Sequence, residues 1–539
     1  MYMLRLKRSA VRMQRDAWQE KGFTLYQFDD QAVREETLAR PQWLHIGCGN
    51  LFRSYVAVLQ QRLLNQGLAK TGIIAATTHN AAVIDDVYTP YDNLFINVIM
   101  EKDGPYKTEV IGSVAEAVAV KRERTADWQR LLQIFTAPTL QLVSFTITEK
   151  GYNLTGFDGA YLDDVRADLA NGPAKTVSSM GMLASLAYAR YQAGAVPTAF
   201  VSMDNCSHNG DRVRKAFLTF AETWAKQGQV EAGFVSYVTD TLSFPYSMID
   251  KIVPSPSVTV QEELRHKDVA DMDFIQAGHS TYALFANAAP QEYLVIEDSF
   301  PNGRPPLEKA GVIFTDRETV NQCERMKVGT CLNPLHTALA VYGCLLGYVK
   351  IADEIQDPQL RGLAEKIGYD EGLPVVADPG VIHPKDFLKE FLEERLPNQN
   401  VPDTPQRIAT DTSQKVGVRY GGTLQAYGQK AKDLKYIPLA IAGWCRYLLG
   451  IDDQGNAFKP SPDPLLADLQ HVLAPVKLGQ PDTATGVLQP ILSHTSIWGG
   501  LDLTALGLEP VVETYFKELI AGPGAVREVL IKYVGGSIK

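Results

Sequence analysis

The fold is decided by residues 43–50, which read Trp-Leu-His-Ile-Gly-Cys-Gly-Asn. The first four form a short apolar run that predicts a buried strand, and the two glycines after it predict a tight turn. Residues 51–64 then carry apolar side chains at helical spacing and end near Gly67, which predicts a helix closed by a glycine. Strand, glycine turn and helix together indicate the opening of a βαβ unit that binds a dinucleotide.

In such a unit the glycine turn brings the main chain close to the ligand. Gly47 and Gly49 allow that approach, and the following helix directs unpaired N–H groups at a pyrophosphate, with Asn50 placed to cap it. The fingerprint is incomplete, because Phe52 stands where G-x-G-x-x-G has its third glycine. An ordinary turn between a strand and a helix therefore stays open as an alternative.

A methyltransferase is a second alternative for the same stretch, since residues 46–50 are similar to the first motif of S-adenosylmethionine enzymes. That motif has an acidic residue near the end of the strand and a further glycine after the turn. This sequence has His45 and Leu51 at those places. These departures disfavour the methyltransferase.

The residues after the second strand normally report which nicotinamide cofactor is bound. Residues 72–76 predict that strand, and Thr-Thr-His-Asn follows it at 77–80. There is no acid to hold a ribose 2′-hydroxyl and no arginine to hold a 2′-phosphate. We expect NAD, because it is the commoner cofactor of catabolic enzymes, and NADP stays open.

Further strand-like runs at 140–145, 197–202 and 293–296 alternate with helical segments. This alternation predicts a mainly parallel sheet with helices on both faces. Beyond about residue 310, apolar residues recur at helical spacing and strand signals become rare. We therefore expect an α/β Rossmann-type N-terminal domain followed by a mostly α-helical C-terminal domain.

The domain boundaries are predicted from local composition. A Pro/Gly-rich stretch at 300–306 predicts a Rossmann-type dinucleotide-binding domain at 41–305 and a helical domain, substrate-binding and catalytic, at 306–539. Residues 1–40 are polar and irregular in pattern, and they predict an N-terminal arm packed on the surface.

The composition argues against several classes of protein. A formal net charge of −10 argues against bulk binding of nucleic acid, and no run approaches the roughly 20 apolar residues of a membrane span. The six cysteines include no C-x-x-C pair and no zinc-finger spacing, which fits a reducing cytosol and a protein without a metal. The basic N-terminus lacks the apolar segment of a secretory signal, and Asp16 and Glu20 argue against a transit peptide, so we expect a cytoplasmic protein.

The segment most informative about chemistry contains Lys327, Asn333 and His336. Asn333 followed by Pro334 predicts the start of a helix, and His336 then lies in its first turn. A ketone that accepts hydride develops negative charge on its oxygen, which an asparagine N–H stabilises while a lysine delivers the proton. In a purely structural alternative, Asn333 is only a cap, Lys327 a solvated charge and His336 a core histidine.

Two further polar clusters are candidates for contact with a substrate. Residues 202–210 include Asn205 and Asn209 and follow a predicted strand, where the ligand crevice of an open α/β sheet lies. Arg407 and Lys415 are two cations on or near one predicted helix, and they suit a carboxylate or hydroxyl groups. The structural alternatives are an Asx-rich turn for the first cluster and a solvated helix face for the second.

Together these segments resemble the long-chain mannitol dehydrogenase family, which includes mannitol 2-dehydrogenases, fructuronate and tagaturonate reductases and arabinitol dehydrogenases. The resemblance runs from about residue 43 to beyond residue 415 and rests on the order and spacing of several motifs. The matching stretches are 47–53, 146–152, 204–205 with 209–210, 244–252, 296–300 with 303–305, 327–336 and 408–415.

The resemblance implies a Rossmann-type domain, a helical domain and a metal-independent reaction in which a lysine is the general acid or base. The catalytic residues carried over by motif are Lys327, Asn333, His336 and Asn209, the two asparagines forming the oxyanion pocket. The implied substrate-binding residues are Arg407, Lys415 and Asn205, and Glu324 is implied in proton passage to water. The implied cofactor-binding residues are Gly47, Gly49, Asn50, Phe52 and Arg53.

The chain departs from the family pattern around the lysine. The family segment runs Lys-x-Arg-x-x-Asn-Gly-x-His, whereas here one more residue separates Lys327 from Asn333, and Pro334 replaces a small residue. The assignment of the lysine therefore requires a local bulge or shift in the chain. Tyr246 replaces an asparagine common in the Phe-Pro-x-Ser motif, which alters the expected substrate pocket.

The first expectation is reduction of a keto-uronate such as fructuronate to an aldonate such as mannonate by NADH. Arg407 and Lys415 suit a carboxylate, but polyol enzymes of the family carry the same two residues, so a polyol 2-dehydrogenase acting on mannitol or arabinitol stays open. A sensor of nucleotides or sugars without catalytic activity is a third alternative, if the altered spacing at Lys327 removes the chemistry. Family members include monomers, and the sequence demands no interface between subunits.

Overall fold

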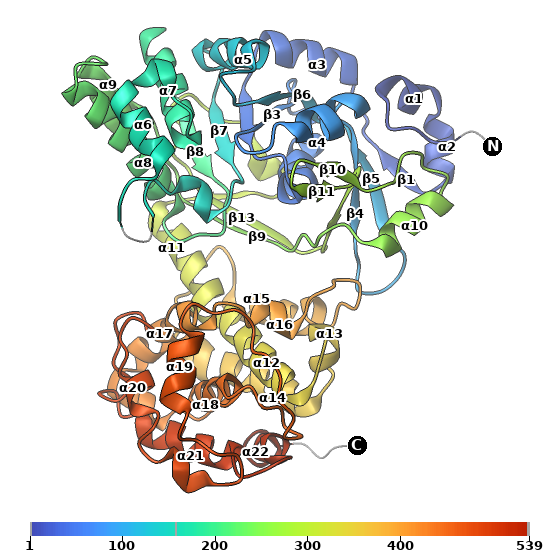
Figure 1. Cartoon of the computed structure of the whole chain (residues 1–539). Helices are drawn as coiled ribbons and strands as arrows, with labels where there is room; N and C mark the ends of the chain where they lie inside the picture. The colour runs from blue at the N-terminus through green and yellow to red at the C-terminus, as the bar shows by residue number, and fades with distance from the viewer. Residues whose placement is uncertain (1–2, 157–158, 536–539) are drawn as a thin grey trace. The chain divides into compact units, whose positions relative to one another are not determined.

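The structure is a computed structural model that describes residues 3–156 and 159–535. The chain divides into two compact units, Met1–Asn321 and Gln322–Lys539. In Figure 1 the first unit runs from blue to yellow-green and the second from yellow to red. The predicted fold class is confirmed, since the first unit is built on parallel strands and the second is mostly helical.

The central sheet of the first unit has five parallel strands in the order β6-β3-β2-β7-β8. Counted along the chain, this order is 3-2-1-4-5, as in a Rossmann fold, and it reverses between β2 and β7. A ligand crevice is expected beyond the carboxyl ends of the strands at that reversal. The strands are β2 (Trp43–Ile46), β3 (Ile73–Thr77), β6 (Val114–Ala119), β7 (Leu142–Phe145) and β8 (Ala199–Ser202).

Two separate apolar clusters cover the two faces of this sheet. Alternate strand residues supply them: Trp43 belongs to one cluster, and its neighbour Leu44 to the other. The cluster with Trp43 includes side chains of α4 (Ala57–Asn65), and the other is built from α5 (Thr125–Thr136), α7 (Ser179–Gln192) and α8 (Asn209–Lys226). Burial on both faces explains why the strands read as continuous apolar runs.

Smaller sheets complete the first unit. One has the order β1-β5-β4-β12, a second has the order β14-β13-β9, and β10 and β11 form a hairpin. The apolar run at 293–296 is therefore a strand of its own sheet, paired antiparallel with β9, and it does not join the parallel sheet. The strands are β1 (Phe23–Leu25), β4 (Phe95–Ile99), β5 (Lys107–Ile111), β9 (Ser247–Lys251), β10 (Ile275–Ala277), β11 (Ser280–Tyr282), β12 (Phe285–Ala288), β13 (Glu292–Glu297) and β14 (Ile313–Thr315).

The division between the units lies beyond the Pro/Gly-rich stretch at 300–306 that the composition singles out. β14 pairs with β13, and the guanidinium of Arg304 lies 3.4 Å from the centre of the Phe314 ring. Arg317 donates to Glu297 at 3.0 Å. These contacts hold the segment after 306 to the first unit.

The second unit is arranged around α12 (Asn333–Leu346), which is apolar and buried on almost every side. This helix packs against α14 (Pro358–Glu365), α16 (Pro405–Ile408), α17 (Val416–Tyr427) and α18 (Tyr436–Leu448). A helix that is apolar all round belongs at the centre of a domain. No helix in the described residues is both long and apolar enough to cross a membrane.

The N-terminal residues are regular structure, and the expectation of an irregular arm is wrong. The chain forms α1 (Arg8–Met13), α2 (Arg15–Glu20), β1 and α3 (Asp30–Ala39). Leu4, Leu6, Val11 and Trp18 are buried in the same apolar cluster as Trp43. The helices are too short to be recognised from a repeating pattern, and tertiary contacts hold them in place.

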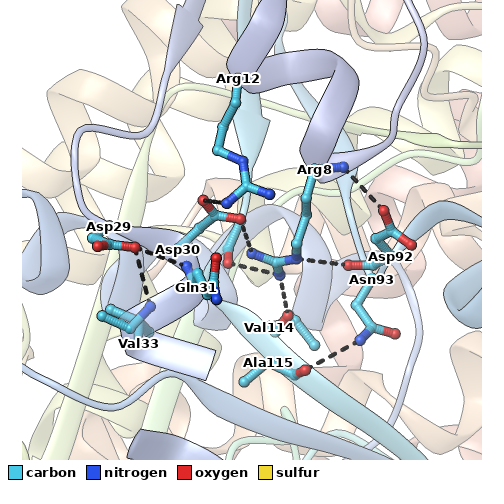
Figure 2. Close-up of polar contacts among 12 residues, drawn as sticks. Arg8, Arg12, Asp29, Asp30, Gln31, Val33, Asp92, Asn93, Val114 and Ala115 are labelled. Carbon is cyan, nitrogen blue, oxygen red and sulfur yellow. Dashed lines mark hydrogen bonds and ion pairs between the residues drawn. The ribbon is translucent and has the colours of Figure 1, made fainter. Parts of the chain in front are cut away.

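Arg8 is the main polar link between this segment and the rest of the first unit (Figure 2). Its guanidinium donates to the Asp30 carboxylate at 3.1 Å and to three main-chain carbonyls, at Asp92 (3.1 Å), Gly112 (3.2 Å) and Val114 (2.8 Å). The side chains of Arg8 and Asp30 are 8% and 4% exposed. Removing one partner of a buried ion pair lowers the stability of a protein strongly, because the other charge stays buried without it.

We predict that Arg8→Met lowers the free energy of unfolding of the first unit by about 3 kcal/mol. The change removes the donor of three buried carbonyls and leaves the buried Asp30 carboxylate with only the longer contact to Arg12, at 3.7 Å. Thermal and urea unfolding measure the effect, with Arg5→Met at an exposed neighbouring position as the control. Equal stability of the two variants would contradict the role given to Arg8.

Candidate active site

A crevice of about 580 Å³ lies in the first unit at the carboxyl ends of β2, β3 and β7, where the strand order reverses. Gly47 and Cys48 line it from the end of β2, Thr77 and Thr78 from the end of β3, and Thr146 from the end of β7. This is the place where a Rossmann fold binds its ligand.

Gly47 must be a glycine for two independent reasons. Its φ is +131°, and a Cβ atom there would lie 2.4 Å from the Thr146 carbonyl oxygen. Gly49 differs, because a Cβ atom there would meet no atom within 4 Å. The first glycine is therefore required by the fold, and the second leaves open space beside the turn for a ligand.

The helix after the turn begins at Asn50, and residues Phe52–Val56 form a π-helical turn before α4. Asn50 accepts a hydrogen bond from the Arg53 guanidinium at 2.6 Å. The same guanidinium is fully buried and also donates to the Ala283 carbonyl at 2.6 Å, and its burial lowers the pKa of Arg53. Phe52 is buried as well and stacks on His45 with 4.4 Å between ring centres. Phe52 and Arg53 thus support the turn from inside, while Gly47 lines the crevice.

A buried polar network connects Thr146, which lines the crevice, to side chains of β2 and β7. His45 contacts the Ser144 hydroxyl at 2.7 Å through Nδ1 and the Thr146 hydroxyl at 2.9 Å through Nε2, and Trp43 donates to Ser144 at 2.7 Å. Burial lowers the pKa of His45 to about 3, so this histidine is neutral. The network fixes Thr146 against Gly47.

The residues after β3 line the crevice, but they lack the charged side chain that usually contacts the ribose 2′-hydroxyl or the 2′-phosphate of the cofactor. Thr77, Thr78, His79 and Asn80 all line it, and they include neither a carboxylate nor an arginine. Asn80 donates to the carbonyl of Ala277 at 2.7 Å and so ties this edge to the β10–β11 hairpin.

Asp204 holds the loop that forms another wall of the crevice. Its carboxylate accepts from the main-chain N–H groups of Ile147 and Thr148, each at 2.9 Å, and from the Tyr152 hydroxyl at 2.6 Å. Burial raises the pKa of Asp204, and these donors oppose that shift. The Asp204 carboxylate therefore links the two motifs at 146–152 and 204–210 directly.

The two asparagines of the 202–210 cluster have different surroundings. Asn205 is exposed, whereas Asn209 is buried at the start of α8. The Asn209 amide nitrogen donates to the carbonyls of Ser202, Asp204 and Ser247 at 2.9–3.2 Å, and its oxygen accepts from the Ser247 N–H at 3.0 Å. Asn209 is thus committed to main-chain partners that join β8 to β9, and its part in an oxyanion pocket stays a prediction.

α11 (Arg317–Met326) begins in the first unit, ends in the second and continues there into a π-helical segment, η8 (Lys327–Cys331). The N–H of Leu332 donates to the carbonyl of Lys327 at 3.1 Å, five residues earlier. A π turn accommodates one more residue than an α turn. A turn of this kind is what the lysine assignment expects from the extra residue between Lys327 and Asn333, and the assignment itself stays a prediction. Lys327 is 3% exposed, and Glu324 lies one turn before it, half-buried.

α12 starts at Asn333 directly after this segment. The side-chain oxygen of Asn333 is buried and accepts no hydrogen bond from any described residue. His336, in the first turn, lies 3.5 Å from the Asp403 carboxylate and edge-on to the Phe391 ring. Burial lowers the pKa of His336 to about 4, more than the Asp403 charge raises it. The first turn of this helix therefore carries an amide with an unpaired oxygen and a neutral imidazole.

Asp403 also explains the placement of Arg407, and the sequence reasoning missed it. Arg407 grips this carboxylate through Nε and Nη2, each at 2.8 Å. Asp403 lies just before α16, and the four-residue spacing across the start of this helix is the signal that would have indicated the pair. Lys415 is half-buried and donates to the Thr410 carbonyl at 2.5 Å, and burial lowers its pKa. Among the described residues, no group of three or more histidine, cysteine, aspartate or glutamate side chains is placed to hold a metal ion.

Comparison with known proteins agrees with both units. The family model of the mannitol dehydrogenase Rossmann domain matches residues 41–309, and that of the mannitol dehydrogenase C-terminal domain matches residues 319–517. A D-mannonate oxidoreductase from Thermotoga maritima is 47% identical over 539 residues, which is 99% of each chain. A polyol:NADP oxidoreductase from Gluconobacter oxydans is 29% identical over 81% of this chain and 85% of its own.

A solved structure shows the same architecture. Pseudomonas fluorescens mannitol 2-dehydrogenase, in a ternary complex with NAD and D-mannitol, superposes with a TM-score of 0.72 at 25% identity. The match covers 96% of this chain and 97% of that one. The protein therefore belongs to the mannitol dehydrogenase family of oxidoreductases.

Proposed function

We propose that the protein interconverts a keto-uronate and an aldonate, with fructuronate and mannonate as the expected pair. The observation that carries the proposal is the π-helical turn at η8, which fits the lysine motif of the family to the start of α12 despite its extra residue. The substrate class follows the D-mannonate oxidoreductase that is 47% identical over the full chain.

A nicotinamide dinucleotide fits the crevice of the first unit. Gly47 lets the turn pack closely against Thr146, and Gly49 leaves open space beside the turn. The cofactor, when bound, supplies the hydride for reduction or accepts it in the reverse direction. The end of β3 neither repels a 2′-phosphate nor grips a 2′-hydroxyl with a carboxylate, so we expect NAD(H) to be used and NADP(H) to be accepted as well.

The second unit supplies the groups that handle the proton and the charge. As the carbonyl oxygen becomes negative, an N–H of Asn333 stabilises it and Lys327 gives it a proton. In the oxidation direction neutral Lys327 takes the proton back, and Glu324 passes it toward water. His336, neutral because of its burial, positions a substrate hydroxyl without adding a charge. The reaction proposed needs no metal.

The second candidate is a polyol 2-dehydrogenase, because the solved structure at TM-score 0.72 binds D-mannitol. A sensor without catalytic activity is the third. Activity measurements separate the three.

We predict that the purified protein oxidises NADH with fructuronate or tagaturonate far faster than with fructose or xylulose. Initial rates of nicotinamide oxidation with NADH and NADPH test this directly. A preference for a neutral ketose would move the enzyme to the polyol class, and no oxidation with any of these substrates would support the sensor.

We predict that Lys327→Ala lowers kcat by about 10²- to 10⁴-fold, the usual contribution of general acid–base catalysis, and leaves NADH affinity nearly unchanged. The variant keeps the crevice of the first unit and loses the proton donor. Lys385→Ala, at an exposed position on α15 (Pro384–Glu390), is the matched control and should behave as wild type. Near-normal turnover of the Lys327 variant would show that the proton has another source.

We predict that His336 makes the protein less stable as the pH falls from about 6.5 toward 4. The pKa of this residue is lower in the folded protein, so the unfolded chain binds the proton first and gains stability in that window. The difference in melting temperature between wild type and His336→Asn should therefore fall between pH 7 and pH 4.5. His45 is present in both proteins, so its contribution to the pH dependence cancels in the difference. A difference that does not change with pH would mean that His336 is protonated as readily in the fold as in solution.

A further inference from the structure

Arg419, in the first turns of α17, is a largely buried cation that no carboxylate neutralises. Within residues 3–156 and 159–535, its hydrogen-bond partner is the Thr337 hydroxyl, which Nη1 contacts, and no acidic side chain lies within ion-pair distance. A guanidinium has five N–H donors. Burial lowers the pKa of Arg419 to about 10, which reflects how poorly the protein itself compensates this charge.

Two other buried arginines, Arg190 and Arg446, are satisfied by several acceptors, whereas the fully buried Arg53 has an unpaired Nε. Arg190 donates to five main-chain carbonyls, and Arg446 donates to three. These arginines hold the fold together, because each ties segments that are distant in the chain. Arg419 makes a single such link and retains donors for a ligand.

The surroundings of Arg419 belong to the candidate site of the second unit. Thr337 directly follows His336 on α12, and its hydroxyl also donates to the Asn333 carbonyl at 2.8 Å. Lys415 lies one helical turn before Arg419, whose N–H donates to the Lys415 carbonyl at 3.0 Å. The Arg419 charge helps to lower the pKa of both His336 and Lys415.

The balance of charge in this region favours an anionic ligand. Arg407 is neutralised by Asp403, and His336 is neutral because burial lowers its pKa. Lys415 donates to an uncharged carbonyl, so Lys415 and Arg419 remain as two adjacent cations without an ion-pair partner in the described residues. A polyol offers these groups only neutral oxygens, whereas a carboxylate offers charge-assisted and bidentate hydrogen bonds.

We propose that Arg419, together with Lys415, binds the carboxylate of the substrate and selects sugar acids over polyols. The inference rests on the proposed function and deepens it by naming the residue that sets the substrate class. Arg407 and Lys415 are common to both branches of the family and leave this choice open. Of the two kinds of substrate, only a sugar acid brings a negative charge that can pair with Arg419.

The test compares the binding of D-mannonate and D-mannitol to the full-length protein by thermal stabilisation. We expect mannonate to bind wild type more tightly than mannitol does. In Arg419→Gln the mannonate affinity should fall by about 10- to 100-fold with little change for mannitol. Arg419→Lys retains the charge without the fork and should give an intermediate loss. Arg361→Gln, which removes a half-exposed pair with Glu365 in the same unit, is the control.

Three results would overturn the proposal. They are no preference of wild type for the acid, an unchanged mannonate affinity in Arg419→Gln, and an equal loss for both ligands in that variant, which would give Arg419 only a structural role through Thr337. If Arg419→Gln does not fold, the acid-to-polyol ratio of Arg419→Lys decides instead. Selective binding of mannonate without its oxidation by NAD or NADP would sink the proposed function and leave the assignment of Arg419 intact.

Discussion

The hydrogen bond from the Leu332 N–H to the Lys327 carbonyl is the constraint on which the candidate site of the second unit depends. One extra residue in an α-helix rotates everything beyond it by about 100°. The π geometry of η8 holds residues 327–331 in one wide turn, and α12 begins at Asn333 just after it. π turns also occur elsewhere in the described residues, as at Phe52–Val56, so the position of η8 just before Asn333 is what distinguishes it.

The same turn fixes α17. The Thr423 hydroxyl donates to the carbonyl of Gly329 inside η8 at 3.0 Å, and the Tyr420 hydroxyl donates to the carbonyl of Pro334 at the start of α12 at 3.0 Å. Both bonds use carbonyls in or just after the irregular turn. Lys415 and Arg419 are carried by the start of α17, so their positions follow from the geometry at η8.

The sequence predicts the features that depend on local pattern. The glycine turn at Gly47, the parallel strands and the helix start at Asn333 have such patterns, and the structure contains each of them. The folding of residues 1–40 has no local signal, because the acceptors of Arg8 lie as far as 106 residues away. The extra residue between Lys327 and Asn333 can be counted in the sequence and predicts a bulge there. No residue type in that segment favours a π turn in particular. The Asn209 amide has main-chain partners on all sides, and Arg419 has no ion-pair partner among the described residues. Both facts depend on which residues the fold brings together, which the spacing of residues in the sequence does not reveal.

The candidate site of the second unit is arranged at a cost to stability. A buried amide oxygen without a donor, as at Asn333, costs about 1–3 kcal/mol, and a leucine at that place would avoid it. A partly buried cation without an ion-pair partner in the described residues, as at Arg419, adds to the cost. Asp204 and Arg190 are well paired, but Asn333 is not alone, since the amide oxygens of Gln60, Asn97 and Asn287 are also buried without a donor among the described residues. Asn333 on α12 and Arg419 on α17 thus keep an acceptor and several donors that the described residues do not use, and a ligand with hydroxyl groups and a negative charge would satisfy both.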